Sequence, residues 1–134
     1  MSKSNATETA LLSYIFTAVN PSWHAATDLD LHLHTADPGE AGNSTTSEAT
    51  YGGYTLVTVD RGVADWTVTG DTVTNANLIH FPQCSSGSNS ITHLSVTPQG
   101  STVILYVATL TSALAVSSGI TPQIAAGDLD FTEA

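Results

Sequence analysis

The stretch DLDLHLH at residues 28–34 decides the fold of this chain. Its three leucines alternate with four polar residues, and residues two apart on a β-strand lie on the same face. The alternation predicts a half-buried strand whose leucines face the core. We expect the other face, formed by Asp28, Asp30, His32 and His34, to be solvated or to lie in an interface.

Segments rich in β-branched and aromatic residues follow this strand, with turn residues between them. We expect further strands at residues 54–59, 66–69, 72–74, 77–81, 91–97, 101–110, 113–116 and 123–131. Gly70 and Asp71 form a two-residue hairpin signal, and residues 98–100 mark a second hairpin. The nearly continuous apolar run at 102–107 predicts a central strand that is buried on both faces. Residues 40–53 are mostly small and polar, and they predict a long exposed loop.

The turn signals recur about every 8 to 12 residues, which is typical of antiparallel all-β folds. The sequence contains no repeat of fixed period and no interdomain linker, so we expect residues 23–134 to form a single domain. The predicted fold is mainly all-β. It is an antiparallel β-sandwich or small barrel of about eight strands with one short N-terminal helix.

Residues 1–22 predict an N-terminal helical arm. Asn5 is the predicted N-cap, and a glutamate three positions later completes a capping-box pattern. Five apolar residues then recur at helical spacing and form one stripe, Leu11, Leu12, Ile15, Phe16 and Val19. Pro21 ends the segment, since the residue before a proline is pushed out of helical geometry. Two interpretations stay open, a helix docked on its own domain and an arm that packs on a neighbouring subunit.

The composition excludes several classes of function. The 134 residues include 12 acidic and only 2 basic residues, so the net charge is −10. Because nucleic-acid binding needs clusters of Lys and Arg, we expect no nucleic-acid partner, and no membrane partner for the same reason. No apolar run approaches the roughly 20 residues that span a bilayer, and the N-terminus does not resemble a signal peptide.

One pattern has the spacing of a metal site. His32 and His34 are two apart on the predicted strand, so their side chains can converge on one ion, with a third ligand from His80 or His93. A polar strand face in an acidic, Thr-rich protein also carries Asp and His simply because they are polar. We favour this second interpretation and expect neither a metal nor another cofactor.

Three further residues are weighed as catalytic groups. Asp37 and Glu40 lie in a predicted turn, where nothing creates the unequal environments that a pair of catalytic carboxylates needs. A turn-capping role for Asp37 is the natural alternative. Cys84 has almost no positive charge available to lower its pKa, so we expect a buried or idle thiol. The sequence therefore predicts no catalytic site and no enzyme.

The two tryptophans and the single arginine are expected to be structural. Trp66 opens a hairpin strand and should pack inward, and Trp23 can anchor the helix to the sheet. Arg61 is expected to pair with a carboxylate, either within the protein or across a contact with another chain.

Several motifs in the same order resemble a family of small tailed-bacteriophage virion proteins, often labelled phage tail fibre proteins. They are LHLHTADPGEAG at 31–42, SEATYGGY at 47–54, WTVTGDTVTNA at 66–76, IHFPQC at 79–84 and LAVSSGITP at 114–122. The resemblance runs from about residue 29 to the C-terminus and does not extend to the N-terminal region. It implies a virion location and assembly into the particle, with no enzymatic residues to transfer.

The preferred hypothesis is a capsid decoration, or cement, protein. It would bind the outside of the head through the major capsid protein, as a homotrimer at local threefold positions. Binding only to the expanded shell would stabilise that shell by mass action. The acidic surface would keep a crowded particle soluble.

The alternative is a tail or tail-fibre component that binds the host surface. Its candidate sugar-binding residues are Tyr51, Gly52, Gly53 and Tyr54. A small metalloprotein using the histidine pair is the third hypothesis.

Overall fold

The computed structural model describes residues 2–133. This part of the chain contains one helix, α1 (Asn5–Thr17), and is otherwise built from β-strands. The strands are β1 (Ser2–Lys3), β2 (Asp28–His34), β3 (Val57–Asp60), β4 (Trp66–Thr69), β5 (Thr72–Asn75), β6 (Ile79–His80), β7 (Ser88–Pro98), β8 (Tyr106–Ser117), β9 (Gln123–Ile124) and β10 (Asp130–Thr132). The prediction of a mainly β protein with one short N-terminal helix is confirmed.

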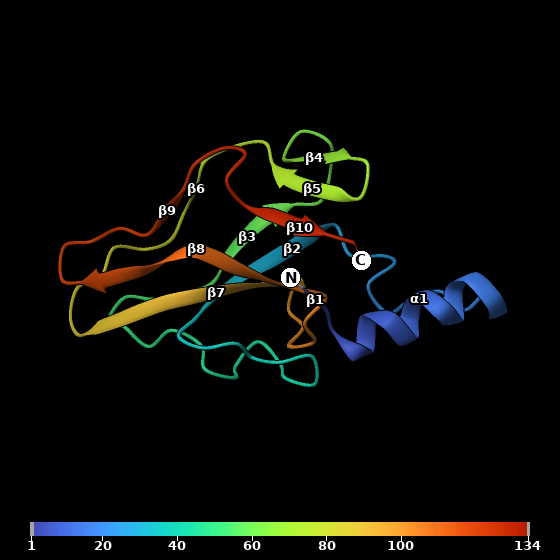
Figure 1. Cartoon of the computed structure of the whole chain (residues 1–134), viewed down its shortest axis with the longest axis horizontal. Helices are drawn as coiled ribbons and strands as arrows, with labels where there is room; N and C mark the ends of the chain where they lie inside the picture. The colour runs from blue at the N-terminus through green and yellow to red at the C-terminus, as the bar shows by residue number, and fades with distance from the viewer. Residues whose placement is uncertain (1, 134) are drawn as a thin grey trace.

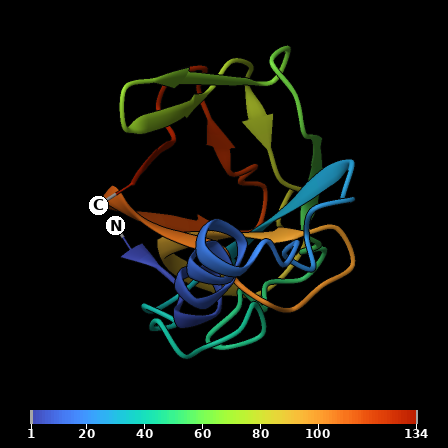
Figure 2. The ribbon, with the colours of Figure 1, turned by 90° about the vertical axis from the view of Figure 1, so that its right-hand side faces the viewer.

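The strands form three antiparallel sheets (Figure 1). The largest has the order β1-β8-β7-β2-β3, a second has the order β10-β5-β4, and β6 pairs with β9. Among residues 2–133 none of these sheets closes into a barrel. Figure 2 shows the two small sheets on one side of the large sheet and the segment between β2 and β3 on the other side.

The core lies between the large sheet and the small sheets. Leu31 of β2 stands opposite Val96 of β7, Leu33 stands opposite Leu94, and all four are buried. The small sheets and their connections cover the core on the side opposite the large sheet. Their buried residues include Ile79, Phe81, Leu129 and Phe131. Full burial of one such side chain contributes about 1.5–3 kcal/mol, so Leu31 and Leu33 of β2 each stabilise the fold by an amount of this order.

Three of the four residues on the polar face of β2, Asp30, His32 and His34, are also buried, so the predicted solvated or interface-facing row is wrong for them, while Asp28 is half-exposed. The segment after β2 folds back over this face and bonds to the backbone of the strand. The Ala49 N–H donates to the Leu33 carbonyl at 2.8 Å, and the Thr35 N–H donates to the Ser47 carbonyl at 2.8 Å. The predicted exposed loop at 40–53 is therefore a partly buried cover, in which Ala49 itself is only 5% exposed.

The apolar run at 102–107 is not a separate central strand. β8 begins at Tyr106 and continues without a break to Ser117, so it also includes the strand predicted at 113–116. Residues before it form a connection in which Val103 is exposed and Ile104 is buried. A continuous apolar run satisfies a strand and a buried connection equally well, and only the pairing with β7 decides between them.

The helix begins one residue earlier than predicted and ends sooner. The Oγ of Ser4, not Asn5, caps it by accepting from the Thr7 N–H at 3.2 Å. Ala18 ends the helix in the left-handed conformation, with φ of 56°, three residues before the proline. Figure 1 shows α1 extending away from the strands, and Phe16 near its far end is 78% exposed. The described chain has no helix with the length and apolar character needed to span a bilayer.

Candidate functional site

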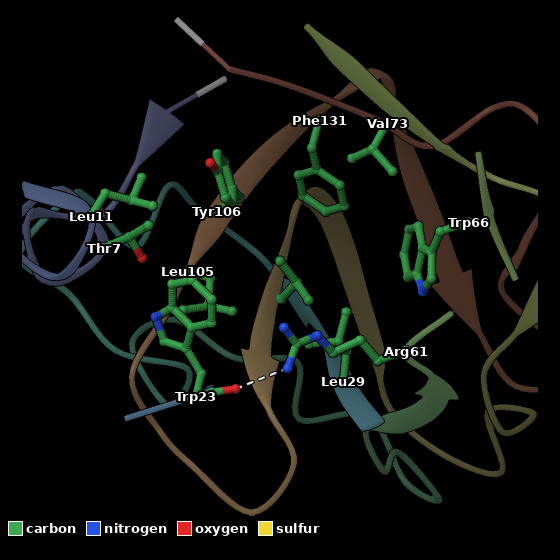
Figure 3. Close-up of a pocket in the computed structure, with 11 residues that line it drawn as sticks. Thr7, Leu11, Trp23, Leu29, Arg61, Trp66, Val73, Leu105, Tyr106 and Phe131 are labelled. Atoms are coloured by element: carbon green, nitrogen blue, oxygen red, sulfur yellow. Dashed lines mark hydrogen bonds between the residues drawn. The ribbon is translucent and has the colours of Figure 1, made fainter. Parts of the chain in front are cut away.

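A cavity of about 210 Å³ opens between the base of α1, the large sheet and the β10-β5-β4 sheet (Figure 3). We call it the aromatic pocket. Four aromatic side chains line it, those of Trp23, Trp66, Tyr106 and Phe131. Aliphatic side chains fill the rest of the wall, from Leu11 of α1, Leu29 of β2, Val73 of β5, Val96 of β7 and Leu105. Thr7 and Arg61 complete the lining, and no residue of the wall carries a carboxylate.

The aromatic walls are fixed by contacts with one another. The ring centroid of Phe131 lies 6.4 Å from that of Trp66 and 6.2 Å from that of Tyr106. The indole Nε1 of Trp66 donates to the Asp60 carbonyl at 3.1 Å. Tilted aromatic pairs at this spacing stabilise one another beyond simple area burial. Trp66 packs against the core from β4, as the sequence predicts.

Arg61 stands beside this wall and holds Trp23 in place. Its Nη1 donates to the carbonyls of Trp23 and Ala26, both at 2.9 Å, and to that of His24 at 3.3 Å. Its Cζ lies 5.8 Å from the centroid of the Trp23 ring, within cation–π range. Within residues 2–133 no carboxylate lies within 4 Å of its guanidinium. The predicted ion pair within the protein is therefore wrong for the described residues, which leaves the pairing across a contact.

Trp23 provides a second hydrogen-bond donor at the wall. Its indole Nε1 is buried and has no acceptor in the described part of the chain. A buried donor without a partner costs roughly 1–3 kcal/mol, so this N–H is a destabilising feature of the protein by itself. The Nε and Nη2 of Arg61 and the indole N–H of Trp23 have no acceptor among residues 2–133, which favours a ligand that brings one.

The chain ends meet at the far side of Tyr106. The Tyr106 hydroxyl donates to the Glu133 carboxylate, which also pairs with the Lys3 ammonium. Burial, together with the hydrogen bond and the charge of Glu133, raises the pKa of Tyr106. Partial desolvation acts to raise the pKa of Glu133, but the bonds from Lys3 and Tyr106 outweigh it and lower that pKa. β1 and the C-terminal residues are tied together beside the pocket.

The two histidines of β2 are buried and bonded to protein through all four ring nitrogens. His32 Nδ1 lies 2.6 Å from Glu48 Oε2, and its Nε2 lies 3.1 Å from Thr97 Oγ1. His34 Nδ1 lies 2.8 Å from the Thr46 carbonyl, and its Nε2 lies 2.7 Å from Ser95 Oγ. This arrangement leaves no ring nitrogen for an ion. Among the described residues no group of three His, Cys, Asp or Glu side chains has metal-binding geometry.

The other metal candidates lie apart from that pair or are bonded elsewhere. His80 is exposed on β6. His93 stands opposite His34 in the β2–β7 ladder, and its Nδ1 lies 2.7 Å from the Thr92 hydroxyl. Burial lowers the pKa of His34, and the charges of His32 and His93 act in the same direction, while the bond to Thr46 and the charge of Glu48 oppose it.

The two aspartates of β2 have different environments. Asp30 is buried and accepts from the Thr58 hydroxyl at 2.7 Å and from the Gly100 N–H at 2.9 Å. Asp28 faces Asp60 across the β2–β3 ladder. Loss of hydration and the adjacent Asp60 carboxyl raise the pKa of Asp28. The predicted solvated row is wrong for Asp30, which the fold buries, while Asp28 is half-exposed.

The predicted sugar-binding tyrosines belong to the core. Tyr51 is 3% exposed, and its hydroxyl donates to the Pro82 carbonyl at 2.8 Å. The Tyr54 hydroxyl donates to Glu48 Oε2 at 2.9 Å and accepts from the Leu33 N–H at 3.1 Å. The prediction that they present their rings to a sugar is wrong, since both rings pack inward.

The structure explains why glycine occupies both positions between these tyrosines. A Cβ at Gly52 would lie 2.1 Å from the Ser86 Oγ, and Gly53 has a φ of 90°. The Gly52 N–H donates to the Ser86 carbonyl at 2.8 Å, so the backbone of the two loops is in close contact. The close approach and the positive φ both favour glycine.

The remaining candidates have structural positions. Asp37 Oδ1 accepts from the Gly39 N–H at 2.9 Å, which is the predicted turn-capping role. Glu40 is exposed, and its backbone carbonyl accepts from the Asn5 N–H at 3.1 Å. Cys84 is 1% exposed, and its thiol donates to the Ser86 carbonyl at 3.2 Å. The predicted buried thiol is confirmed.

The aromatic pocket is the site that the sequence did not predict. Trp23, Trp66 and Arg61 are each notable in the sequence, but they come from three separate connections and strands. No spacing rule joins residues that meet only when two sheets and a helix pack together. The usable signal is compositional, since the pocket contains both tryptophans and the only arginine of the chain.

Comparison with known proteins gives one family. The family described as "Podophage GP4 fiber I protein gp80" matches residues 2–132. The match includes the N-terminal region, which the motif resemblance did not reach. No curated protein matches the chain at a significant level. Because the matched range covers nearly the whole sequence, the chain belongs to the podophage GP4 fiber I protein gp80 family, a family of phage virion structural proteins.

Proposed function

We propose that this protein is a non-enzymatic structural component of a phage tail fibre. The single observation that carries the proposal is the family match, which spans residues 2–132 and whose description names a fibre protein. That description favours the tail over the head, so the tail-fibre alternative replaces head decoration as the preferred function. The capsid-binding hypothesis rested on a single small β-domain, its N-terminal arm and its acidic surface, which suit both locations.

The side chains that could carry chemistry support a structural role. The ring nitrogens of His32 and His34 are engaged with protein groups, and the thiol of Cys84 is buried. A catalytic base must reach the substrate within hydrogen-bond distance, and these groups face the interior. The surface of the protein, not a reactive centre, is then its working part.

We also propose that α1 carries a contact with a second copy of the chain. Its outer half exposes Leu12, Ile15 and Phe16 at 58%, 66% and 78%. Residues 9–23 contain none of the acidic or basic residues, whereas the chain as a whole has a net charge of −10. Two copies can therefore meet here without placing like charges in the contact. The predicted trimer is one form that such a contact can take.

Localisation in intact virions tests the tail-fibre proposal. Gold-labelled antibody against the purified protein should bind at the tail of the particle, and the copy number should be a few to a few tens per virion. Particles that lack the protein should keep stable heads. Label spread over the head in hundreds of copies, or heads that disassemble without the protein, would contradict the proposal and restore head decoration.

A further inference from the structure

We propose that the aromatic pocket receives one aromatic side chain from another virion protein, and that a carboxylate next to that side chain pairs with Arg61. The inference rests on the proposed structural function and names the chemistry of the partner. The residues that carry it are Arg61, Trp23 and the aromatic walls from β4, β8 and β10 (Figure 3).

The size of the pocket selects a group of one ring. An engineered protein cavity of about 150 Å³ lined by apolar side chains binds benzene. The aromatic pocket, at about 210 Å³, has room for one ring and its methylene. Pockets for whole small-molecule ligands generally begin at about 300 Å³, so a larger ligand such as a nucleotide does not fit.

The lining selects an aromatic group over a sugar. Nine of the eleven wall residues are aromatic or aliphatic, and the others are Thr7 and Arg61. The Thr7 hydroxyl is already bonded to Ser4 Oγ at 3.2 Å. A sugar would bury several hydroxyls against carbon without hydrogen bonds, which is unfavourable. An aromatic ring instead finds tilted partners in Trp66, Phe131 and Tyr106.

The charge at the rim selects an acidic neighbour for that ring. Arg61 uses Nη1 for three backbone carbonyls, and its Nε and Nη2 have no acceptor among residues 2–133. The Trp23 indole N–H also lacks one. Figure 3 shows the indole nitrogen on the edge of the ring that faces away from Arg61, so Arg61 is the donor for the carboxylate, and arginine pairs with carboxylates through two parallel hydrogen bonds. The chain has 12 acidic side chains, yet among residues 2–133 none lies within 4 Å of the Arg61 guanidinium, so a carboxylate from a partner can pair with it.

A second copy of this chain does not offer that combination. Among the described residues the exposed aromatic side chains are Tyr14 and Phe16, and they lie within residues 9–23, which have no carboxylate. The partner is therefore a different protein with an aromatic residue directly beside Asp or Glu. Arg61 is exposed, so the pocket is reached from the surface.

The test uses the full-length protein and the peptide acetyl-Ala-Phe-Asp-Ala-amide, with acetyl-Ala-Phe-Asn-Ala-amide as the neutral match. Both tryptophans of the chain line the pocket, so tryptophan fluorescence reports binding directly. Binding should be weak, and the acidic peptide should bind about tenfold more tightly than the amide, since charge-assisted bonds are roughly twice as strong as neutral ones. Equal affinity of the two peptides would overturn the role of Arg61.

Variants locate the site and control for folding. Leu11→Trp should fill the pocket and abolish binding of both peptides, while Val63→Ala, at a side chain that is 96% exposed outside the pocket, should leave binding unchanged. Arg61→Gln should remove the preference for the acidic peptide. Because that change also releases the backbone at Trp23 and Ala26, Arg61→Lys serves as a second variant that keeps the charge and should keep part of the preference. Binding that survives Leu11→Trp would overturn the pocket assignment.

A third probe, the small aromatic acid 3-phenylpropionate, distinguishes a pocket that binds a partner protein from a pocket that binds a free small molecule. If 3-phenylpropionate binds a hundredfold more tightly than the acidic peptide, the pocket serves a free small molecule and the partner proposal is wrong. These measurements use the isolated protein, so they fail or succeed independently of where the protein lies in the virion.

Discussion

At the scale of single residues, the polar face of β2 shows how a buried polar row is stabilised. Asp30, His32 and His34 are all buried, and each has protein hydrogen-bond partners. A buried polar group costs free energy only when it is left unpaired, so this row stabilises one specific arrangement of the covering segment. Substitutions at two residues, Glu48 and His34, measure this stabilisation.

The first concerns Glu48, whose carboxylate Oε2 bonds both His32 and the Tyr54 hydroxyl. Glu48→Ala leaves both partners without that acceptor, and we expect the free energy of unfolding to fall by about 2 kcal/mol. Urea denaturation measures it. Glu40→Ala is the matched control, because its side chain is exposed, and it should change stability by less than about 0.5 kcal/mol. Equal effects of the two substitutions would contradict the assignment.

The second concerns pH and His34. Burial lowers the pKa of this histidine in the folded protein below its ordinary value of 6.5. Below pH 6.5 the unfolded chain binds a proton at His34 that the folded protein does not bind. The contribution of the neutral, buried His34 to the free energy of unfolding is therefore fully present above pH 6.5. It is lost as the pH falls from 6.5 to the pKa of His34 in the folded protein. For one proton, the free energy of unfolding changes by at most about 1.4 kcal/mol per pH unit.

Denaturant titrations between about pH 7.5 and about pH 5 measure this slope, above the range in which the carboxylates titrate. His34→Asn should be less stable at neutral pH and should have a smaller slope between those limits. An unchanged slope would show that His34 is not the group responsible.

At the scale of elements, the start of α1 is decided by side-chain geometry and not by residue type alone. Ser4 and Asn5 are both good capping residues, and the Asn5–Glu8 spacing matches a capping box. Ser4 nevertheless caps the helix, because β1 pairs with β8 up to Lys3 and Ser4 N–H then donates to the Leu105 carbonyl at 3.1 Å. The pairing of the preceding strand sets where the helix can begin.

This assignment gives a prediction with its own control. Ser4→Ala removes the cap and the hydroxyl bond to the Ile104 carbonyl, so we expect a loss of about 1–2 kcal/mol in unfolding free energy. Asn5→Ala should change it by less than about 0.5 kcal/mol, since its exposed side chain has no capping role. Thermal unfolding followed by circular dichroism compares the two. The reverse order of effects would restore Asn5 as the cap.

At the scale of the whole molecule, the acidic residues are unevenly distributed along the chain, and residues 9–23 and 72–127 contain none of them. The net charge of −10 opposes the approach of two copies, and the outer half of α1 is an apolar surface whose residues carry no charge. The proposed self-contact through α1 therefore depends on ionic strength, because salt screens the repulsion between the acidic surfaces.

We expect self-association to strengthen when salt rises from about 0.01 M to about 0.15 M, as the Debye length falls from about 30 Å to about 8 Å. Phe16→Asp should reduce association strongly, because it places a charge in the apolar contact. Val63→Asp adds the same charge at an exposed site away from α1 and should have a smaller effect. Sedimentation velocity over a range of concentrations gives the oligomeric state. A monomer at all concentrations, or equal effects of the two substitutions, would contradict the contact.

The amino-acid sequence alone was enough to predict the β-strand at 28–34, the hairpin at Gly70 and Asp71, the N-terminal helix and the family resemblance. These depend on residue spacing, turn chemistry and short motifs, which are local properties. Only the tertiary structure decided that the polar face of β2 is buried, that Tyr51 and Tyr54 face the core, and that Trp23, Trp66 and Arg61 meet. The physical reason is that burial of a strand face depends on which segment covers it, and a pocket forms from residues that are brought together only by packing.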